Sequence, residues 1–119
     1  MDSREMALYA AETLDDKKAF DITLINIGEK AAFADYFVIA TGGNVRQIET
    51  LVDEVHDRFD EADIPVKHVE GKKSSGWILM DYGDVVINIM SEDMRNRYNL
   101  EKLWADCETE YYERNGYEK

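Results

Sequence analysis

The chain has one cysteine, one proline and no long apolar run among its 119 residues. A lone Cys107 cannot form an internal disulfide, which is typical of proteins from a reducing compartment. No apolar stretch approaches the roughly 20 residues that cross a bilayer, and the first residues lack the order of a signal peptide. We therefore expect a cytoplasmic protein that does not associate with membranes.

Basic residues are also scarce. The chain carries 14 lysines and arginines against 26 aspartates and glutamates, which gives a formal net charge of −12 and a pI near 4.5. Such a field repels phosphates, so extensive direct nucleic-acid binding is disfavoured. Solubility alone explains the acidic excess, and attraction to a basic partner is the functional alternative.

Side chains that could perform chemistry are few. The two histidines, His56 and His68, stand apart from Cys107, and no Cys/His spacing typical of a metal site occurs. Asp53 and Glu54 follow a glycine-rich turn, but their neighbours repeat at helical spacing, which directs both carboxylates to solvent. We predict no catalytic residue, no metal and no cofactor.

Apolar periodicity, caps and turn residues predict eight elements. They are a helix capped by Ser3 and running to about Asp16, strands Phe20–Ile27 and Tyr36–Ala40, a helix from Asn44 to about Ala62, strands Val66–Val69, Trp77–Met80 and Val85–Met90, and a last helix capped by Asn99. The last helix would carry Leu100, Leu103, Trp104, Cys107 and Tyr111 on one face.

This order of elements predicts the α/β class, as a single domain with a mixed β-sheet of about five strands and flanking helices. The first two strands would pair antiparallel, the strand–helix–strand segment would form a right-handed parallel crossover, and residues 77–90 would form an antiparallel hairpin. We place the domain at residues 1–107. Residues 108–119 are interpreted as the end of the last helix and a polar tail.

The hairpin turn reads Asp81-Tyr82-Gly83-Asp84. A type I turn closed by a glycine bulge needs positive φ at Gly83 alone, whereas a type I′ turn would force Tyr82 to positive φ as well. We predict the first form. Asp81 and Asp84 then cap the turn and need no metal.

The segment Thr41-Gly42-Gly43-Asn44 lies between a predicted strand and a predicted helix, where backbone amides can hold a phosphate. A nucleotidyltransferase-like, nucleotide-binding enzyme that uses the Gly42-Gly43 turn is therefore an alternative function. Neither the Walker lysine nor the dinucleotide glycine spacing is present, so we favour a tight turn.

Large apolar residues and arginine gather between residues 77 and 104. Trp77, Met90, Met94, Tyr98 and Trp104 would by default belong to the core. Tryptophan, tyrosine and arginine are also the side chains that dominate protein interfaces, and Arg95 lies among them. The segment therefore has the composition of a docking surface.

Four sequence blocks carry a family resemblance. They are Asp35 to Gly42 with Arg46-Gln47, Val69-Glu70-Gly71, Trp77 to Val86, and Arg95 with Tyr98 and Leu100 to Trp104. With these blocks in this order, the chain resembles the Iojap-like ribosomal silencing factors. It departs from the family pattern at Gly43-Asn44, where serine or threonine is common after the first glycine, and at Asn88, where histidine is frequent.

The resemblance implies a nucleotidyltransferase-like topology without the catalytic residues, and a binding protein instead of an enzyme. It further implies docking on universal large-subunit protein fourteen of the large ribosomal subunit, a steric block of subunit joining that represses translation, and a homodimer when free. Carried over by position, the interface or interface-supporting residues are Trp77, Asp81, Gly83, Asp84, Arg95, Tyr98, Leu100 and Trp104. On this basis Arg95 and the aromatic side chains are expected to supply contact energy.

Overall fold

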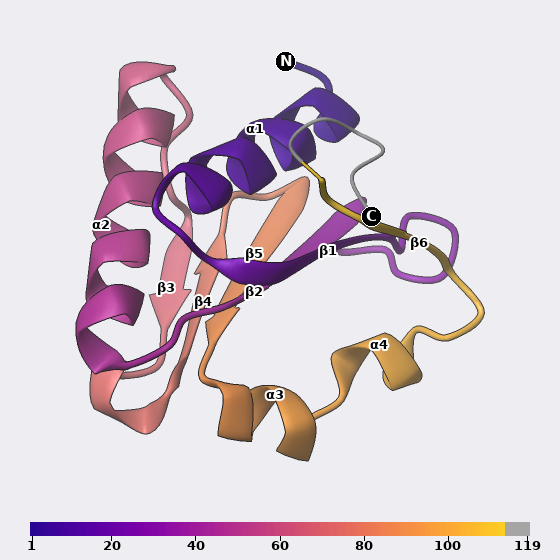
Figure 1. Cartoon of the computed structure of the whole chain (residues 1–119). Helices are drawn as coiled ribbons and strands as arrows, with labels where there is room; N and C mark the ends of the chain where they lie inside the picture. Colours follow the sequence, from indigo (N-terminus) through magenta and orange to yellow (C-terminus); the bar gives the residue numbers. More distant parts are fainter. Residues whose placement is uncertain (114–119) are drawn as a thin grey trace.

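The structure is a computed structural model that describes residues 1–113. Its centre is a six-stranded mixed sheet in the order β3-β4-β5-β2-β1-β6, with helices on both faces (Figure 1). The strands are β1 (Phe20–Asn26), β2 (Tyr36–Thr41), β3 (His68–Glu70), β4 (Trp77–Asp81), β5 (Val85–Met90) and β6 (Glu108–Tyr111). The helices are α1 (Ser3–Asp16), α2 (Val45–Glu61), α3 (Glu92–Arg97) and α4 (Leu100–Leu103), with a short 3-10 turn, η1 (Lys73–Ser75).

The sheet confirms the predicted α/β class and the predicted strand directions. β1 pairs antiparallel with β2, and β4 pairs antiparallel with β5 as a hairpin. β2 and β5 lie side by side and parallel at the centre of the sheet. β3 pairs antiparallel with β4 and therefore runs in the same direction as β2, so the hairpin lies between the two strands that α2 connects.

Alternating side chains divide the interior into two cores, one on each face of the sheet. Val38 on β2 and Ile87 on β5 pack with α1 and α2 in the larger core. Phe37 and Val86 point to the opposite face, where α3, α4 and the chain that follows them cover a smaller core. Figure 1 shows α1 above the sheet and α3 and α4 below it. Within residues 1–113, no helix is long and apolar enough to span a membrane.

The helix caps follow the predicted chemistry with one shift. Asp2, not Ser3, caps α1: its side chain accepts a hydrogen bond from the Glu5 amide, and the Glu5 carboxylate accepts one from the Asp2 amide. Asn44, where the predicted helix begins, caps α2 through a 2.8 Å hydrogen bond from the Gln47 amide. A full capping box places the α1 cap one residue earlier because two amides are satisfied instead of one.

The end of the chain corrects a prediction. Asn99 does cap a helix, but α4 has only four residues and ends before Trp104. Residues 108–111, predicted as the end of that helix, form β6, which pairs antiparallel with β1 and accounts for the sixth strand. Cys107 and Tyr111 therefore share no helical face with Leu100. The free edge of β1 offers backbone hydrogen bonds that a short polar helix end cannot match.

Candidate docking surface

A shallow groove of about 470 Å³ lies on the face of the sheet that α3 and α4 cover. Its lining consists of Glu70, Gly71, Ser75, Trp77, Leu79, Met94 and Tyr98. Trp77 is half-buried and Tyr98 is 47% exposed, and their ring centroids are 5.2 Å apart. The structure thus brings two of the predicted interface residues together, from β4 and from the end of α3, as one aromatic pair.

The wall of the groove depends on a glycine. Gly71 has a φ of +100°, and a Cβ built on it would lie 2.2 Å from the Trp77 carbonyl oxygen. A side chain here would collide with backbone and would also strain the chain. The Glu70-Gly71 pair of the resemblance therefore has a local reason: it lets the loop before η1 pass close to β4.

Arg95 lies inside this surface instead of on it. Its side chain is 10% exposed, and its guanidinium donates hydrogen bonds to the hydroxyls of Thr41 and Thr23 at 2.8 Å each and to the Glu101 carboxylate at 2.6 Å. The expectation that Arg95 supplies contact energy is therefore replaced by a supporting role: it ties α3 to β1, β2 and the start of α4.

Trp104 and Leu100 belong to a second aromatic group on the same face. The Trp104 ring meets Phe37 at a centroid distance of 5.7 Å and Phe33 at 6.5 Å, and Leu100 packs against this core. Phe33 is 60% exposed and Leu103 is 68% exposed. Sequence reasoning placed Leu103 on the apolar face of the last helix, and its exposure corrects that prediction. It missed Phe33, although a phenylalanine in the loop between two strands is a readable signal.

The turn residues Asp81, Gly83 and Asp84 lie at the opposite end of the hairpin from Trp77, about 13 Å along β4 at ~3.3 Å per residue. Gly83 has a φ of +93° and its amide donates to the Asp81 carboxylate at 2.8 Å, while Tyr82 is not among the residues with positive φ. The prediction of positive φ at Gly83 alone is confirmed, but the predicted glycine bulge is wrong. The Tyr82 amide donates to the Val85 carbonyl at 2.9 Å and Asp81 pairs with Val86, so Gly83-Asp84 is a two-residue loop with glycine at its first position. The carbonyl of Asp84 accepts hydrogen bonds from the amides of Asp35 and Tyr36, so these residues shape the sheet end.

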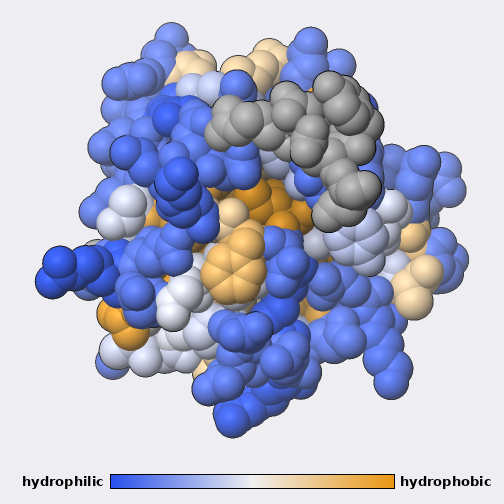
Figure 2. Space-filling model, viewed as in Figure 1, coloured by the Kyte–Doolittle hydropathy of each residue, from blue (hydrophilic) through white to orange (hydrophobic). Residues whose placement is uncertain are grey.

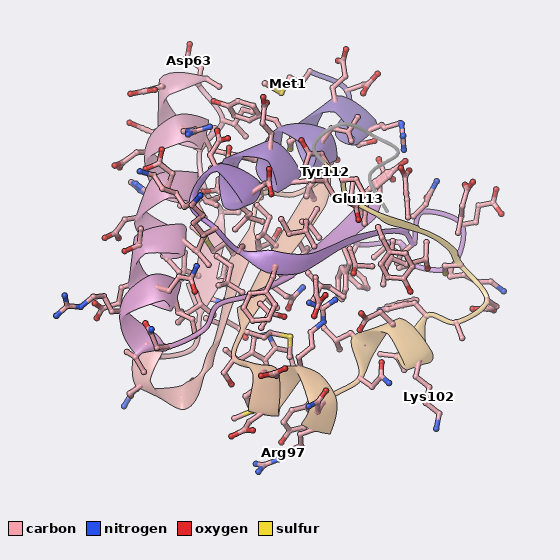
Figure 3. The ribbon with its side chains drawn as sticks, viewed as in Figure 1. Met1, Asp63, Arg97, Lys102, Tyr112 and Glu113 are labelled. Carbon is pink, nitrogen blue, oxygen red and sulfur yellow. The ribbon has the colours of Figure 1, made fainter. Side chains whose placement is uncertain are left out.

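Charged side chains surround the apolar groups. His68 and Glu70 form a 2.7 Å pair beside the groove. Arg97 and Lys102, both exposed, point away from the sheet on the outer side of α3 and α4 (Figure 3). The space-filling view in Figure 2 is hydrophilic over most of its area, with apolar side chains gathered near the middle. An apolar groove with charged side chains beside it is the ordinary anatomy of a protein interface.

The glycine turn has its own structural explanation. The Gly43 amide donates to the Gln47 side-chain oxygen at 2.6 Å, and a Cβ on Gly42 would lie 2.8 Å from Ile48. These contacts fit a tight strand-to-helix turn, and both glycine amides already have partners, since the Gly42 amide donates to the Met90 carbonyl at 2.9 Å. Glu54 is engaged as well, in a 2.8 Å ion pair with Arg58. Within residues 1–113 no group of three or more His, Cys, Asp or Glu could hold a metal.

Two groups with reactive chemistry are held in their neutral forms. Desolvation raises the pKa of the Cys107 thiol, which opposes thiolate formation. Burial of Tyr82 against Phe59 raises the pKa of its phenol to about 12. Neither group is therefore poised as a nucleophile or a base near neutral pH.

Comparison with known proteins identifies the family. A family model described as ribosomal silencing factor during starvation matches residues 1–118. The ribosomal silencing factor RsfS of Bacillus subtilis (strain 168) is 40% identical over 107 residues, which cover 90% of this chain and 91% of that protein. A mouse protein named mitochondrial assembly of ribosomal large subunit protein 1 is 32% identical over 95 residues, 77% of this chain and 42% of its own length.

The fold agrees with the sequence match. A crystal structure of a protein from Chromobacterium violaceum has a TM-score of 0.84 and 32% identity to this chain, and the match covers 88% of both chains. The match in sequence and the match in fold both agree with the family resemblance carried by the four sequence blocks. The chain belongs to the family of ribosomal silencing factors.

Proposed function

We propose that this protein docks on universal large-subunit protein fourteen of the large ribosomal subunit and prevents the small subunit from joining. The observation that carries the proposal is the Trp77–Tyr98 pair: two aromatic side chains in contact, with their rings tilted by 40°, partly exposed and beside an apolar groove. Exposed aromatic anchors of this kind contribute much of the affinity in protein interfaces. The names of the relatives, with their ribosomal silencing and large-subunit assembly, support a ribosomal partner.

The block would be steric. A 13.8 kDa domain bound at the joining face occupies space that the small subunit needs, so no bond has to be made or broken. The net charge of −12 favours encounter with a basic ribosomal protein, because complementary charge raises association rates. Repression of translation in the cytoplasm follows from the partner that we propose.

Addition of the purified protein to separated subunits, followed by gradient sedimentation, tests this proposal. We expect joining to fall in proportion to the protein added, to be half-blocked near one protein per two large subunits, and to recover when small subunits are in large excess. No nucleotide or metal should be needed. Inhibition at far fewer than one protein per large subunit, or inhibition that persists after the protein is washed away, would contradict a steric block and favour enzymatic modification.

The partner is tested by pull-down with the isolated large-subunit protein, using Trp77→Ala and Tyr111→Ala side by side. Tyr111 is also an exposed aromatic residue, at 67%, but it lies on the edge strand β6. We expect Trp77→Ala to lose the complex and Tyr111→Ala to keep it. Equal retention by both variants would remove the groove from the docking surface.

We also propose that the free protein is a homodimer, as the resemblance implies. Light scattering across a concentration series, with and without large subunits, measures this directly. A mass near 13.8 kDa at all concentrations would contradict the dimer and leave the docking proposal intact.

A further inference from the structure

Asn88 is a polar side chain in an otherwise apolar stretch of the central strand β5. It is 0% exposed, and its neighbours along the strand, Ile87 and Ile89, are equally buried. Burying an amide is unfavourable unless its hydrogen bonds are made. Asn88 makes one such bond: its Oδ1 accepts from the Trp77 indole Nε1 at 3.0 Å, while its Nδ2 is buried with no partner among residues 1–113.

The direction of this bond follows from the chemistry of its two atoms. An indole N–H is only a donor, so the Asn88 atom that faces it must be the carbonyl oxygen. The sheet register explains how the indole reaches it: Leu79 lies directly opposite Asn88, and Trp77 lies opposite Met90, so the Trp77 ring extends diagonally across the hairpin. The bond therefore fixes the ring relative to β5.

We propose that Asn88 is a positioning residue for docking. It holds the Trp77 indole in the orientation that contacts the Tyr98 ring at an interplanar angle of 40°, and it does this from inside the protein without touching the partner. The inference rests on the proposed docking role of the Trp77–Tyr98 pair. Trp77 is only half-buried, so without Asn88 its N–H can bond to water when the ring rotates outward, and that rotation would break the contact with Tyr98.

Two near-isosteric substitutions separate positioning from stability. Asn88→Leu removes the acceptor and also the unpartnered Nδ2, so we expect an unchanged or higher melting temperature with about tenfold weaker large-subunit binding. Asn88→Asp keeps an acceptor at the same place but buries a carboxyl group. It should melt at a lower temperature and bind within about twofold of the parent, measured below its melting range. Binding that simply follows stability in both variants would overturn the proposal.

Removal of the donor supplies the second test. In a Trp77→Phe background no indole N–H remains, so adding Asn88→Leu should change binding by less than about twofold. A tenfold effect of Asn88→Leu in both backgrounds would mean that Asn88 acts by another route, and the proposal would fall.

Nuclear magnetic resonance of the free protein tests the positioning without any ribosome. The chain has two tryptophans, so the Trp77 indole signal is the one that Trp77→Phe removes. Asn88→Leu should shift this signal and speed its hydrogen exchange, whereas Asn88→Asp should leave it protected. An unmoved signal in Asn88→Leu contradicts the inference even if the parent docks. A moved signal with no binding by the parent contradicts the proposed function alone.

Discussion

The two faces of the sheet are covered very differently. On one face, α1 and α2, with 14 and 17 residues, close a core in which Leu14, Leu51 and Phe59 are fully buried. On the other face, α3 and α4 have six and four residues, and Tyr98 and Leu103 remain exposed. Complete coverage gives stability, while incomplete coverage leaves apolar side chains available to a partner. If the groove is the docking surface that we propose, stability and docking are assigned to opposite faces of one small domain.

The largest expected effect is on the closed face. Phe59→Ala removes a ring with 0% exposure that packs against Tyr82 at 4.4 Å and Tyr9 at 5.3 Å between centroids. We expect a loss of about 3–5 kcal/mol in the free energy of unfolding, because the cavity cannot be filled by its neighbours. Urea denaturation followed by circular dichroism measures it. A loss below about 1 kcal/mol would show that this face does not carry the stability of the fold.

Arg95→Met tests what holds the open face together. The substitution keeps an unbranched apolar stem but removes the three hydrogen bonds to Thr23, Thr41 and Glu101. We expect a loss of about 2–3 kcal/mol in unfolding free energy, since hydrogen bonds to a charged group are the stronger kind and the buried hydroxyls of Thr23 and Thr41 both lose their guanidinium donor.

The conservative Arg95→Lys is the matched control for this prediction. A lysine keeps the charge but cannot reach all three acceptors with a planar fork, so it should recover less than half of the loss. Full recovery by lysine would show that charge alone ties α3 and α4 to the sheet.

Tyr98→Ala should have the opposite pattern to the substitutions above: a large effect on docking and a small effect on the stability of the fold. The side chain is 47% exposed, so we expect the free energy of unfolding to change by less than about 1 kcal/mol. Large-subunit binding should weaken by about 2 kcal/mol, the typical cost of truncating an interface aromatic. Sedimentation binding assays measure the second quantity. A variant that is stable and binds like the parent would place Tyr98 outside the interface and break the division between the two faces.

The smallest expected effect is a pH dependence introduced by Asn88→His. A neutral imidazole can accept the Trp77 indole hydrogen bond, and a protonated one cannot. Binding by this variant should therefore weaken, by tenfold or less, as the pH falls through the ordinary imidazole value of about 6.5. The parent, with no titrating group at this position, should give a flatter profile between pH 5 and 8. Identical profiles would show that position 88 does not influence docking.

The sequence predicted the elements whose own periodicity is strong. The apolar stripe of α2, with Ile48, Leu51, Val55 and Phe59, is fully buried as expected, and β2 and β5 are buried along their whole lengths. The end of the chain could not be predicted in the same way. Its four residues, Glu108–Tyr111, become a strand only because β1 offers a free edge far away in the sequence.

The docking surface was predictable in composition but not in arrangement. Trp77 and Tyr98 were expected at an interface, and the structure places them side by side. The burial of Arg95 depends on hydroxyls 54 and 72 residues away, which no local pattern reports. Asn88 was noted as a departure from the family pattern, but its bond to Trp77 needs the register of the hairpin. Spacing along a chain indicates a face, whereas hydrogen-bond partners depend on the tertiary fold.

The position of β5 at the centre of the sheet has a consequence for synthesis. Residues 85–90 fill the gap between β4 and β2, so a chain that has emerged only as far as Asp81 leaves the apolar β2 with one unpaired edge. Such an intermediate is prone to associate with other exposed strands. The parallel β2–β5 pairing also joins segments that are distant in sequence, which slows folding. The protein should therefore become protease-resistant late and in a single step, after Met90 has left the ribosome.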